Sequence, residues 1–290
     1  MPASGQAAFD EMLADLRLTD RQREVARGRI GHLDTFFRTS YQLGKAPWAI
    51  GSYNRETLIR WERDVDVMVA LSVAAYWPRY KDDSRAFLAW IRDGLNREYH
   101  TTRVSTRLIS VRLFLGEEME VDLVPSFVRQ GGGYLIPNGL GGWRSTNPPF
   151  HHDLIEAANV RLASRLKPLV RLLKAWNNAN EHPLRSFHVE MMVLSAHRTA
   201  YAVPAWSTAV AQSLASLAGQ VAARCPDPWA PPIQFIDDDL SGIERQSARN
   251  MLAADAASAA RALQLEQSGR HREAFGEWDT VYRGKFPAYG

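Results

Sequence analysis

The sequence contains a single cysteine, Cys225, among its 290 residues. One cysteine cannot form an internal disulfide, and it cannot supply the several thiolates of a cysteine zinc cluster. Structural disulfides are typical of oxidising compartments, so their exclusion favours a reducing environment. We therefore expect a cytoplasmic protein.

Long apolar runs are also missing. The longest extends from Val67 to Trp77 and is interrupted by Ser72, which is far short of the roughly 20 apolar residues that a membrane-spanning helix needs. The first residues, MPASGQAAFDEML, have no basic segment followed by an apolar core. We expect neither a secretion signal nor a membrane partner.

Neither sign of charge dominates the composition. Lys and Arg number 35 against 32 Asp and Glu, and the net charge is +3. This near parity does not indicate nucleic-acid binding, and we expect no requirement for nucleic acid. With 46% hydrophobic and 23% charged residues, the chain can bury one large core or two smaller ones. We expect two lobes around a central cleft.

The most informative pattern is GSYNRETLIRWERDVD, which ends in two carboxylates. Asp64 and Asp66 are two residues apart, and a strand places such residues on one face. The apolar run from Val67 to Leu71 suits a buried strand, so both carboxylates would lie where the strand begins. Carboxylates are hard ligands that suit Mg²⁺, and two such ions can stabilise the attacking and leaving oxygens of a displacement at phosphorus.

A third carboxylate is expected on a neighbouring strand. The alternating sequence MEVDLVP, from Met119 to Pro125, predicts a half-buried strand with Asp122 on the face away from the core. Residues 108–115 predict the strand before it, and Gly116–Glu117 fit a tight hairpin turn between the two. Asp122 is therefore the candidate third metal ligand.

Each part of this pattern has a simpler alternative. An acidic pair at a strand end is usually solvated, and Ser52 could simply be the N-cap of the short helix that follows it. The ordered combination is more specific than its parts. A Gly-Ser step, an Asp-x-Asp pair entering an apolar strand and a lone Asp in an alternating strand together favour metal-dependent nucleotidyl transfer.

The rest of the sequence is predicted to be largely helical. The spacing of apolar residues predicts helices over residues 8–40, 83–99 and 241–268. It also predicts a long helix from Asp153 to Trp176, which Pro168 should kink or restart. We therefore expect an α+β fold, with the sheet and an N-terminal helix in residues 1–150 and a helical C-terminal lobe in residues 151–290.

Residues 131–142 are rich in glycine but lack the Lys-Ser/Thr ending of a phosphate-binding loop. A flexible connection between lobes and a part of a nucleobase pocket both remain open. Thr146 and Asn147 follow this stretch, and an Asn amide can read a base edge because it donates and accepts at once. Asn-Pro-Pro is equally an ordinary turn. Lys174 is a candidate triphosphate clamp or a solvated basic residue on a packed helix.

Taken in this order, the motifs resemble the nucleotidyltransferase (polymerase β-like) fold. They are more specifically similar to the cGAS/DncV-like nucleotidyltransferases, or CD-NTases, of bacterial CBASS antiphage signalling. Three later segments carry the second resemblance: IPNGLGGWRSTNPPFHHD (136–153), RLKPLVRLLKAWN (165–177) and LRSFHVEMM (184–192). The resemblance spans most of residues 50–196. Two departures are Ile50, where the family often has Gln, and Glu56-Thr57, where it often has Gly-Thr.

The resemblance implies a nucleotidyltransferase core with a mixed sheet, and an enzyme that makes cyclic di- or trinucleotide second messengers from nucleoside triphosphates with release of pyrophosphate. ATP is the expected substrate, and a product-activated effector protein and a regulatory protein are the implied partners. The cofactor would be two Mg²⁺ ions, with Mn²⁺ as a substitute. The implied site residues are Asp64, Asp66 and Asp122 at the metals, Gly51, Ser52, Lys174 and Ser186 at the triphosphate, and Thr146 and Asn147 at the base.

Two other functions remain open. One is a nucleotidyltransferase with another acceptor: a linear 2′-5′ oligoadenylate, an RNA 3′ end or a small-molecule hydroxyl. The other is a non-catalytic module that binds nucleic acid. Intact carboxylates argue against the second.

Overall fold

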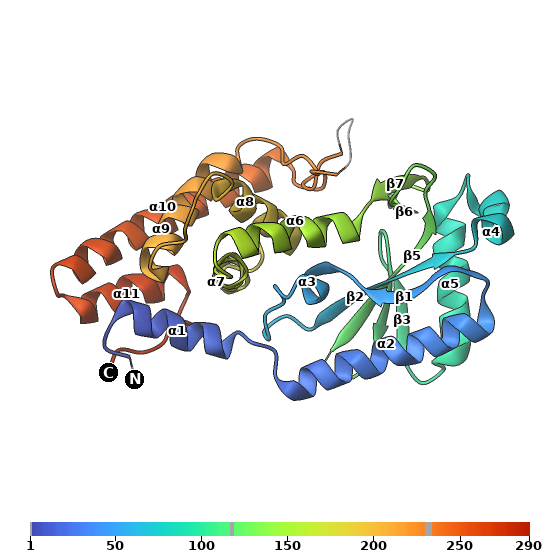
Figure 1. Cartoon of the computed structure of the whole chain (residues 1–290), viewed down its shortest axis with the longest axis horizontal. Helices are drawn as coiled ribbons and strands as arrows, with labels where there is room; N and C mark the ends of the chain where they lie inside the picture. Colours follow the sequence, from blue (N-terminus) through green and yellow to red (C-terminus); the bar gives the residue numbers. More distant parts are fainter. Residues whose placement is uncertain (1, 117–118, 230–233) are drawn as a thin grey trace. The chain divides into compact units, whose positions relative to one another are not determined.

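The structure is a computed structural model that describes residues 2–116, 119–229 and 234–290. The chain divides into two compact units (Figure 1). The sheet unit comprises residues 18–56 and 62–152, and the helical unit comprises residues 1–17, 57–61 and 153–290. No helix within the described residues is long and apolar enough to cross a membrane.

The sheet unit contains seven strands among the described residues. β2 and β5 run parallel, and the other strand pairs are antiparallel, so the sheet is mixed as expected for the α+β class. The strand order is β1 (Leu43–Ala49), β2 (Asp64–Leu71), β5 (Glu120–Val128), β4 (Val111–Phe114) and β3 (Arg103–Thr106), and β6 (Tyr134–Pro137) joins β5 to β7 (Trp143–Thr146).

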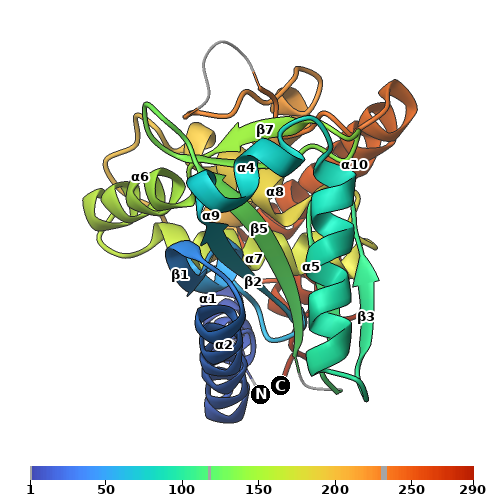
Figure 2. The same cartoon turned by 90° about the vertical axis from the view of Figure 1, so that its right-hand side faces the viewer.

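One face of this sheet packs against helices. Phe127 of β5 contacts Trp77 of α4 (Val73–Tyr80) and Phe87 of α5 (Ser84–Glu98), with ring centroids 5.3 and 4.9 Å apart. Figure 2 shows α5 standing beside the strands, and α2 (Asp20–Ser40) lies along β1. Because side chains alternate along a strand, residues 64 and 66 of β2 and residue 122 of β5 point to the opposite face.

The helical unit is built around one apolar core. Phe9 contacts the rings of Trp278 and Phe286, with centroids 4.9 and 5.0 Å apart, and Ile59 belongs to the same core. Its helices are α1 (Gly5–Asp15), most of α6 (Pro148–Arg161), α7 (Leu166–Ala179), α8 (Ser186–Ala196), α9 (Trp206–Gln220), α10 (Gly242–Gln267) and α11 (His271–Val281).

The helix predicted over residues 8–40 is two helices, α1 and α2. The side chain of Thr19 accepts from the backbone N–H of Gln22, whose side chain accepts from the backbone N–H of Thr19. This capping box forms the N-terminus of α2 and so separates it from α1. Because Phe9 packs among the C-terminal helices, residues 1–17 belong to the helical unit. The expected grouping with the sheet therefore holds for α2, whereas α1 lies in the helical unit.

The long helix predicted from Asp153 is also interrupted, in the way that Pro168 allows. Ala163 and Ser164, between α6 and α7, have φ angles of 51° and 62°. Pro168 then lies in the first turn of α7, where a missing N–H costs no helical hydrogen bond. The predicted restart is confirmed.

Residues 131–142 form part of a β-hairpin, which the sequence did not predict. β6 pairs with β5 and with β7. The interpretation of this stretch as a flexible connection was therefore wrong. The strands were missed because four residues next to glycines offer too few alternating positions to be recognised. The strand predicted over residues 108–115 is shorter, and the turn predicted at Gly116–Glu117 lies partly outside the described residues.

Candidate active site

Asp64 and Asp66 lie at the start of β2, as predicted. Both are half-buried, whereas Val65 between them is buried. Across the parallel β2–β5 pair, Asp64 is in register with Glu120 and Asp66 is in register with Asp122. Registered residues on adjacent strands point to the same face. Four acidic side chains, rather than the three expected, therefore share one face of the sheet.

Asp122 is more buried than its alternating pattern predicted. Its residue surface is only 8% exposed, and the residues that follow it on β5 are buried up to Phe127. β5 lies between β2 and β4 in the sheet, so its side chains have neighbours on both sides. The strand that was predicted to be half-buried is thus buried on both faces from Val121 to Phe127, and Asp122 is a carboxylate enclosed by polar neighbours.

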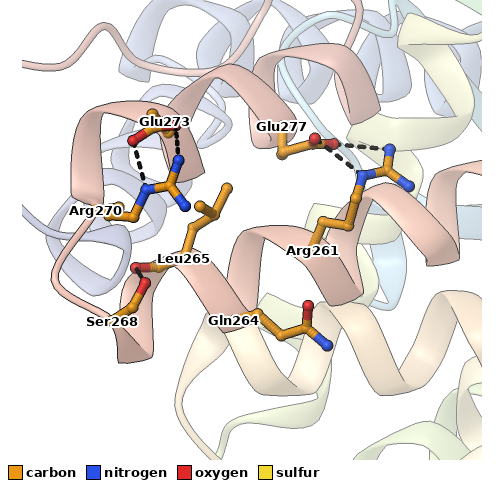
Figure 3. Close-up of a pocket in the computed structure, with 7 residues that line it drawn as sticks. All are labelled: Arg261, Gln264, Leu265, Ser268, Arg270, Glu273 and Glu277. Atoms are coloured by element: carbon orange, nitrogen blue, oxygen red, sulfur yellow. Dashed lines mark hydrogen bonds and ion pairs between the residues drawn. The ribbon is translucent and has the colours of Figure 1, made fainter.

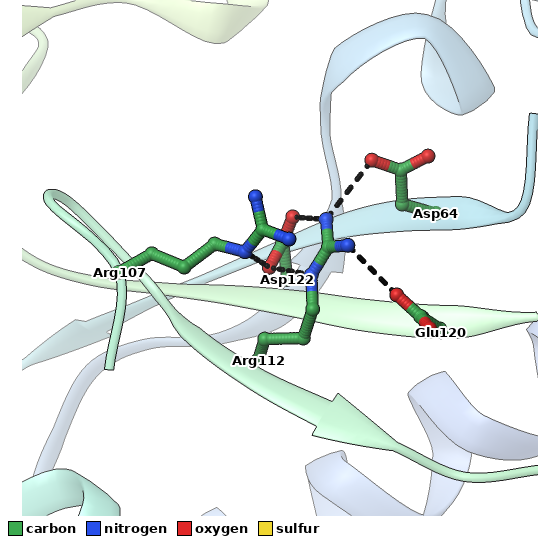
Figure 4. A network of polar contacts seen from close by, with 5 residues as sticks. All are labelled: Asp64, Arg107, Arg112, Glu120 and Asp122. Atoms are coloured by element: carbon green, nitrogen blue, oxygen red, sulfur yellow. Dashed lines mark hydrogen bonds and ion pairs between the residues drawn. The ribbon is translucent and has the colours of Figure 1, made fainter. Parts of the chain in front are cut away.

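Arg112 of β4 is the main neighbour (Figure 4). It lies in register with Asp122. Its Nε donates to Oδ1 of Asp122 at 2.8 Å, and its Nη2 donates to Oδ2 of the same carboxylate. The guanidinium also donates to Oε2 of Glu120 at 2.7 Å and to Oδ2 of Asp64 at 3.1 Å. These bonds, led by the one to Asp122, raise the pKa of Arg112.

Sequence reasoning missed Arg112, although one signal was present. An arginine inside the apolar run LISVRLFL is unusual, because charged residues are rarely buried unless they are paired. On β4 the flanking Val111 and Leu113 are buried, so Arg112 points to the other face of the sheet. Pairing β4 with β5 places that face beside Asp122.

Gly51 lies directly against Asp66. The backbone N–H of Ile50 donates to the carbonyl of Asp66 at 2.9 Å, and α3 (Gly51–Asn54) starts at the next residue. Gly51 has a φ of 64°, and a Cβ atom at this position would overlap the carboxylate of Asp66. Ser52 is buried inside α3, whose N-cap is Ile50, so the alternative role of Ser52 as N-cap was wrong. The Gly-Ser step therefore places a helix start beside the acidic pair.

The predicted phosphate contacts in the helical unit are Lys174 and Ser186. Lys174 of α7 is fully buried, and its Nζ donates to the carbonyl of Thr57 at 3.1 Å. It is thus not the solvated basic residue that was the simpler alternative. Ser186 is the first residue of α8. Their contacts with phosphates stay predictions.

The predicted base readers lie at the start of α6. Thr146 is the last residue of β7, and Oδ1 of Asn147 accepts from the backbone N–H of Phe150 at 3.3 Å. Asn147 therefore caps α6, which accounts for its place before two prolines. A contact of either residue with a base stays a prediction.

The acidic face fits a divalent cation by donor type, and its carboxylates come from strands that lie side by side. Asp64, Asp66 and Asp122 offer hard oxygen ligands from two adjacent strands, as Mg²⁺ requires. Within the described residues, no group of three or more His, Cys, Asp or Glu side chains already has an arrangement that could hold a metal. Oxygens of Asp64, Asp122 and Glu120 instead bond to the guanidinium of Arg112.

A second set of charged residues surrounds a pocket between α10 and α11 (Figure 3). There Arg261 pairs with Glu277, and Arg270 pairs with Glu273. Each arginine that lines this pocket already has a carboxylate partner. This pocket therefore offers a polyphosphate less attraction than its two arginines suggest.

Comparison with known proteins supports the resemblance to nucleotidyltransferases that the sequence motifs indicated. Residues 3–159 match the family model described as the Second Messenger Oligonucleotide or Dinucleotide Synthetase domain. Over 158 residues the chain is 30% identical to a cyclic AMP-AMP-AMP synthase of an Acinetobacter strain, a match that covers 53% of this chain and 42% of that synthase. A probable cyclic nucleotide synthase of Bacillus cereus is 21% identical over an alignment of 334 positions, covering 100% of this chain and 99% of that protein.

A solved structure shows the same fold over nearly the whole chain. CdnC of E. coli MS115-1, in a complex with a HORMA protein, superposes with a TM-score of 0.75 at 18% identity and covers 97% of each chain. The family model covers more than half of the present chain. The chain therefore belongs to the Second Messenger Oligonucleotide or Dinucleotide Synthetase family, and the resemblance to CD-NTases, nucleotidyltransferases that make cyclic oligonucleotides, is confirmed.

Proposed function

We propose that this protein joins nucleoside triphosphates and closes the product into a cyclic di- or trinucleotide, with release of pyrophosphate. The observation that carries the proposal is the set of acidic residues on one sheet face, in register across β2 and β5, beside the Gly51-Ser52 helix start. This is a site for metal-dependent displacement at an α-phosphate, in a chain whose family makes such products.

Asp64, Asp66 and Asp122 would hold two Mg²⁺ ions, for which Mn²⁺ can substitute. When bound, the ions neutralise charge on the phosphates and activate the attacking ribose hydroxyl. The protein's own contribution is positioning. Gly51 leaves room for the Asp66 carboxylate at the start of α3, and the register of the β2–β5 pair sets the spacing of the acidic residues. Positioning and charge stabilisation account for most of the rate in nucleotidyl and phosphoryl transfer.

The names of the relatives support finer proposals on substrate and partner. The name of the Acinetobacter relative states that it joins three AMP units, which favours ATP as a substrate here. The complex of CdnC with a HORMA protein favours a regulatory protein partner. We extend the proposal to antiphage signalling in the cytoplasm, in which the cyclic product activates a separate effector. Lys174, Ser186, Thr146 and Asn147 remain the proposed nucleotide contacts.

The test is product formation from triphosphates alone. Purified protein is incubated with each labelled triphosphate in Mg²⁺ or Mn²⁺, and phosphatase-resistant products are identified by linkage-specific nucleases and mass spectrometry. The D64N/D66N double variant should release no pyrophosphate. The matched control is D82N, which removes one carboxylate from a residue that is exposed in the structure. Wild-type turnover in D64N/D66N would contradict the proposal.

The same assay separates the alternatives. A product that forms only after RNA or a small-molecule hydroxyl is added would indicate a nucleotidyltransferase with that acceptor. Salt-sensitive binding of nucleic acid, with no turnover in either metal, would indicate a binding module.

A further inference from the structure

Arg112 bonds to the same oxygen atoms that divalent cations need. Both oxygens of Asp122 accept from its guanidinium, and so does Oδ2 of Asp64. We propose that Arg112 is a positioning residue that divalent cations displace. It holds Asp64, Glu120 and Asp122 together in the metal-free protein and, by competing with the ions, sets their affinity. This inference rests on the proposed function.

The acidic face is electrostatically unfavourable when no cation is bound to it. Asp64, Asp66, Glu120 and Asp122 lie in register on two adjacent strands, and their negative charges repel one another. The Arg112 side chain is only 11% exposed, as is that of Asp122, so water screens this contact poorly. A two-pronged arginine–carboxylate bond is among the strongest hydrogen bonds in proteins. Arg112 therefore stabilises the acidic face when no other cation is present.

A divalent cation competes with Arg112 for the same carboxylate oxygens. A Mg²⁺ ion takes carboxylate oxygens at about 2.0–2.1 Å in a nearly ideal octahedral arrangement. The guanidinium and a divalent ion both carry positive charge and repel each other strongly when they share the Asp122 carboxylate in a poorly exposed site. Binding of the ion therefore weakens or breaks the bonds from Arg112 to Asp64 and Asp122.

The displaced guanidinium can keep one of its carboxylate partners. Glu120, which is not among the predicted metal ligands, accepts from Nη1 of Arg112 at 2.7 Å. That bond uses a different nitrogen from the Nη2 that contacts Asp64 and Asp122. Arg112 can thus keep its bond to Glu120 while it releases the other two carboxylates. Arg107 is a weaker neighbour, because its side chain is 51% exposed and its Nε lies 3.7 Å from Oδ1 of Asp122.

The test measures metal binding directly, without nucleotide and without turnover. Free Mn²⁺ is followed by electron paramagnetic resonance during titration of the wild type, R112Q and a control variant, R103Q. Arg103 is an exposed residue of β3 that stacks on Phe114. R112Q should bind Mn²⁺ at least about fivefold more tightly than the wild type, because the competing charge is gone. R103Q should bind as the wild type does.

Thermal unfolding supplies a second readout. R112Q should have a lower Tm than the wild type in EDTA and a larger increase in Tm on addition of Mn²⁺, since tighter ligand binding stabilises the folded state more. Equal or weaker Mn²⁺ binding by folded R112Q would overturn the proposal, because it would make Arg112 a plain scaffold for the ligands.

A second variant covers the case in which R112Q does not fold. R112K keeps the charge but loses the planar fork that engages both oxygens of Asp122. It should bind Mn²⁺ more tightly than the wild type but less tightly than R112Q, because the charge remains while the two-pronged bond that the ion must displace from Asp122 is lost. Binding equal to or weaker than that of the wild type would again overturn the proposal. A wild type that binds Mn²⁺ and makes product, with unchanged affinity in the Arg112 variants, refutes this inference alone. A wild type that binds no Mn²⁺ and makes no product refutes the proposed function as well.

Discussion

Asp66 and Asp122 lie in register with each other across the parallel strands β2 and β5. They are far apart in the sequence, and only the pairing of these two strands brings their carboxylates to one face of the sheet. The register of this parallel pair aligns Asp64 with Glu120 and Asp66 with Asp122. The predicted catalytic carboxylates therefore depend on the topology of the sheet unit.

Replacing Gly51 by alanine should disturb this arrangement at one point. The added Cβ would overlap the Asp66 carboxylate, and the φ of 64° would cost roughly 1 kcal/mol in any residue with a side chain. We expect G51A to fold and to lose more than about 100-fold in kcat/KM, because the Asp66 carboxylate, a proposed metal ligand, is displaced by an ångström or more. The measurement is pyrophosphate release from ATP.

A matched control for this substitution is G28A. Gly28 lies in α2, and a Cβ there meets nothing within 4 Å. This variant should keep full activity and gain about 0.5–1 kcal/mol of stability from better helix propensity. Wild-type activity in G51A would show that the close approach of Gly51 to the Asp66 carboxylate is not needed for catalysis.

Phe9 should behave as a core residue of the helical unit, despite its place near the N-terminus. It is fully buried between Trp278 and Phe286. F9A should lower the free energy of unfolding by about 3–5 kcal/mol, as truncation of a buried aromatic residue usually does. Urea denaturation followed by circular dichroism measures the effect, with the exposed E11A as control. A change below about 1 kcal/mol in F9A would contradict the packing of α1 into this core.

Asp237 should make stability depend on pH. It is 3% exposed, and its Oδ2 lies 2.6 Å from Nη1 of Arg245. Its Oδ1 accepts from the backbone N–H of Cys225 at 3.0 Å. Burial alone would raise the pKa of Asp237, but the bonds from Arg245 and Cys225 outweigh it, and the pKa is lowered. A carboxyl group whose pKa is lower in the folded state stabilises the protein above its unfolded pKa of about 3.9. That contribution is lost as the pH falls through the folded value.

The corresponding variant is D237N. It should lower the free energy of unfolding at pH 7 by about 3 kcal/mol, because it leaves Arg245 without its buried anion. The difference from the wild type should shrink as the pH falls below about 4. D238N is the control, since the Asp238–Arg224 pair is half-exposed and should contribute less than about 1 kcal/mol. A difference between D237N and the wild type that does not change with pH would contradict the account.

The elements that could be predicted from the sequence are those with long local patterns. β2 was predictable because an unbroken apolar run follows Asp64, and α5 because its buried residues recur at helical spacing. Asp122 was placed correctly on a strand because Met119–Pro125 alternates. These patterns depend only on which face of each element is buried, so neighbouring residues suffice to reveal them.

Features that depend on distant pairing could not be predicted in this way. β1 contains Pro47 and pairs irregularly with β2, so its residues show little alternation. The role of Arg112 depends on the register of β4 against β5, which no local pattern gives. The membership of residues 1–17 and 57–61 in the helical unit depends on contacts with helices far along the chain.

The most direct test of the catalytic site is the location of bound metal. Crystals of the protein grown with Mn²⁺ and a non-hydrolysable ATP analogue should show two anomalous peaks, with oxygens of Asp64, Asp66 and Asp122 within about 2.3 Å of them. The same map should show Arg112 still bonded to Glu120 but released from Asp64 and Asp122. Anomalous peaks elsewhere, or none at these three carboxylates with the analogue bound, would contradict the account.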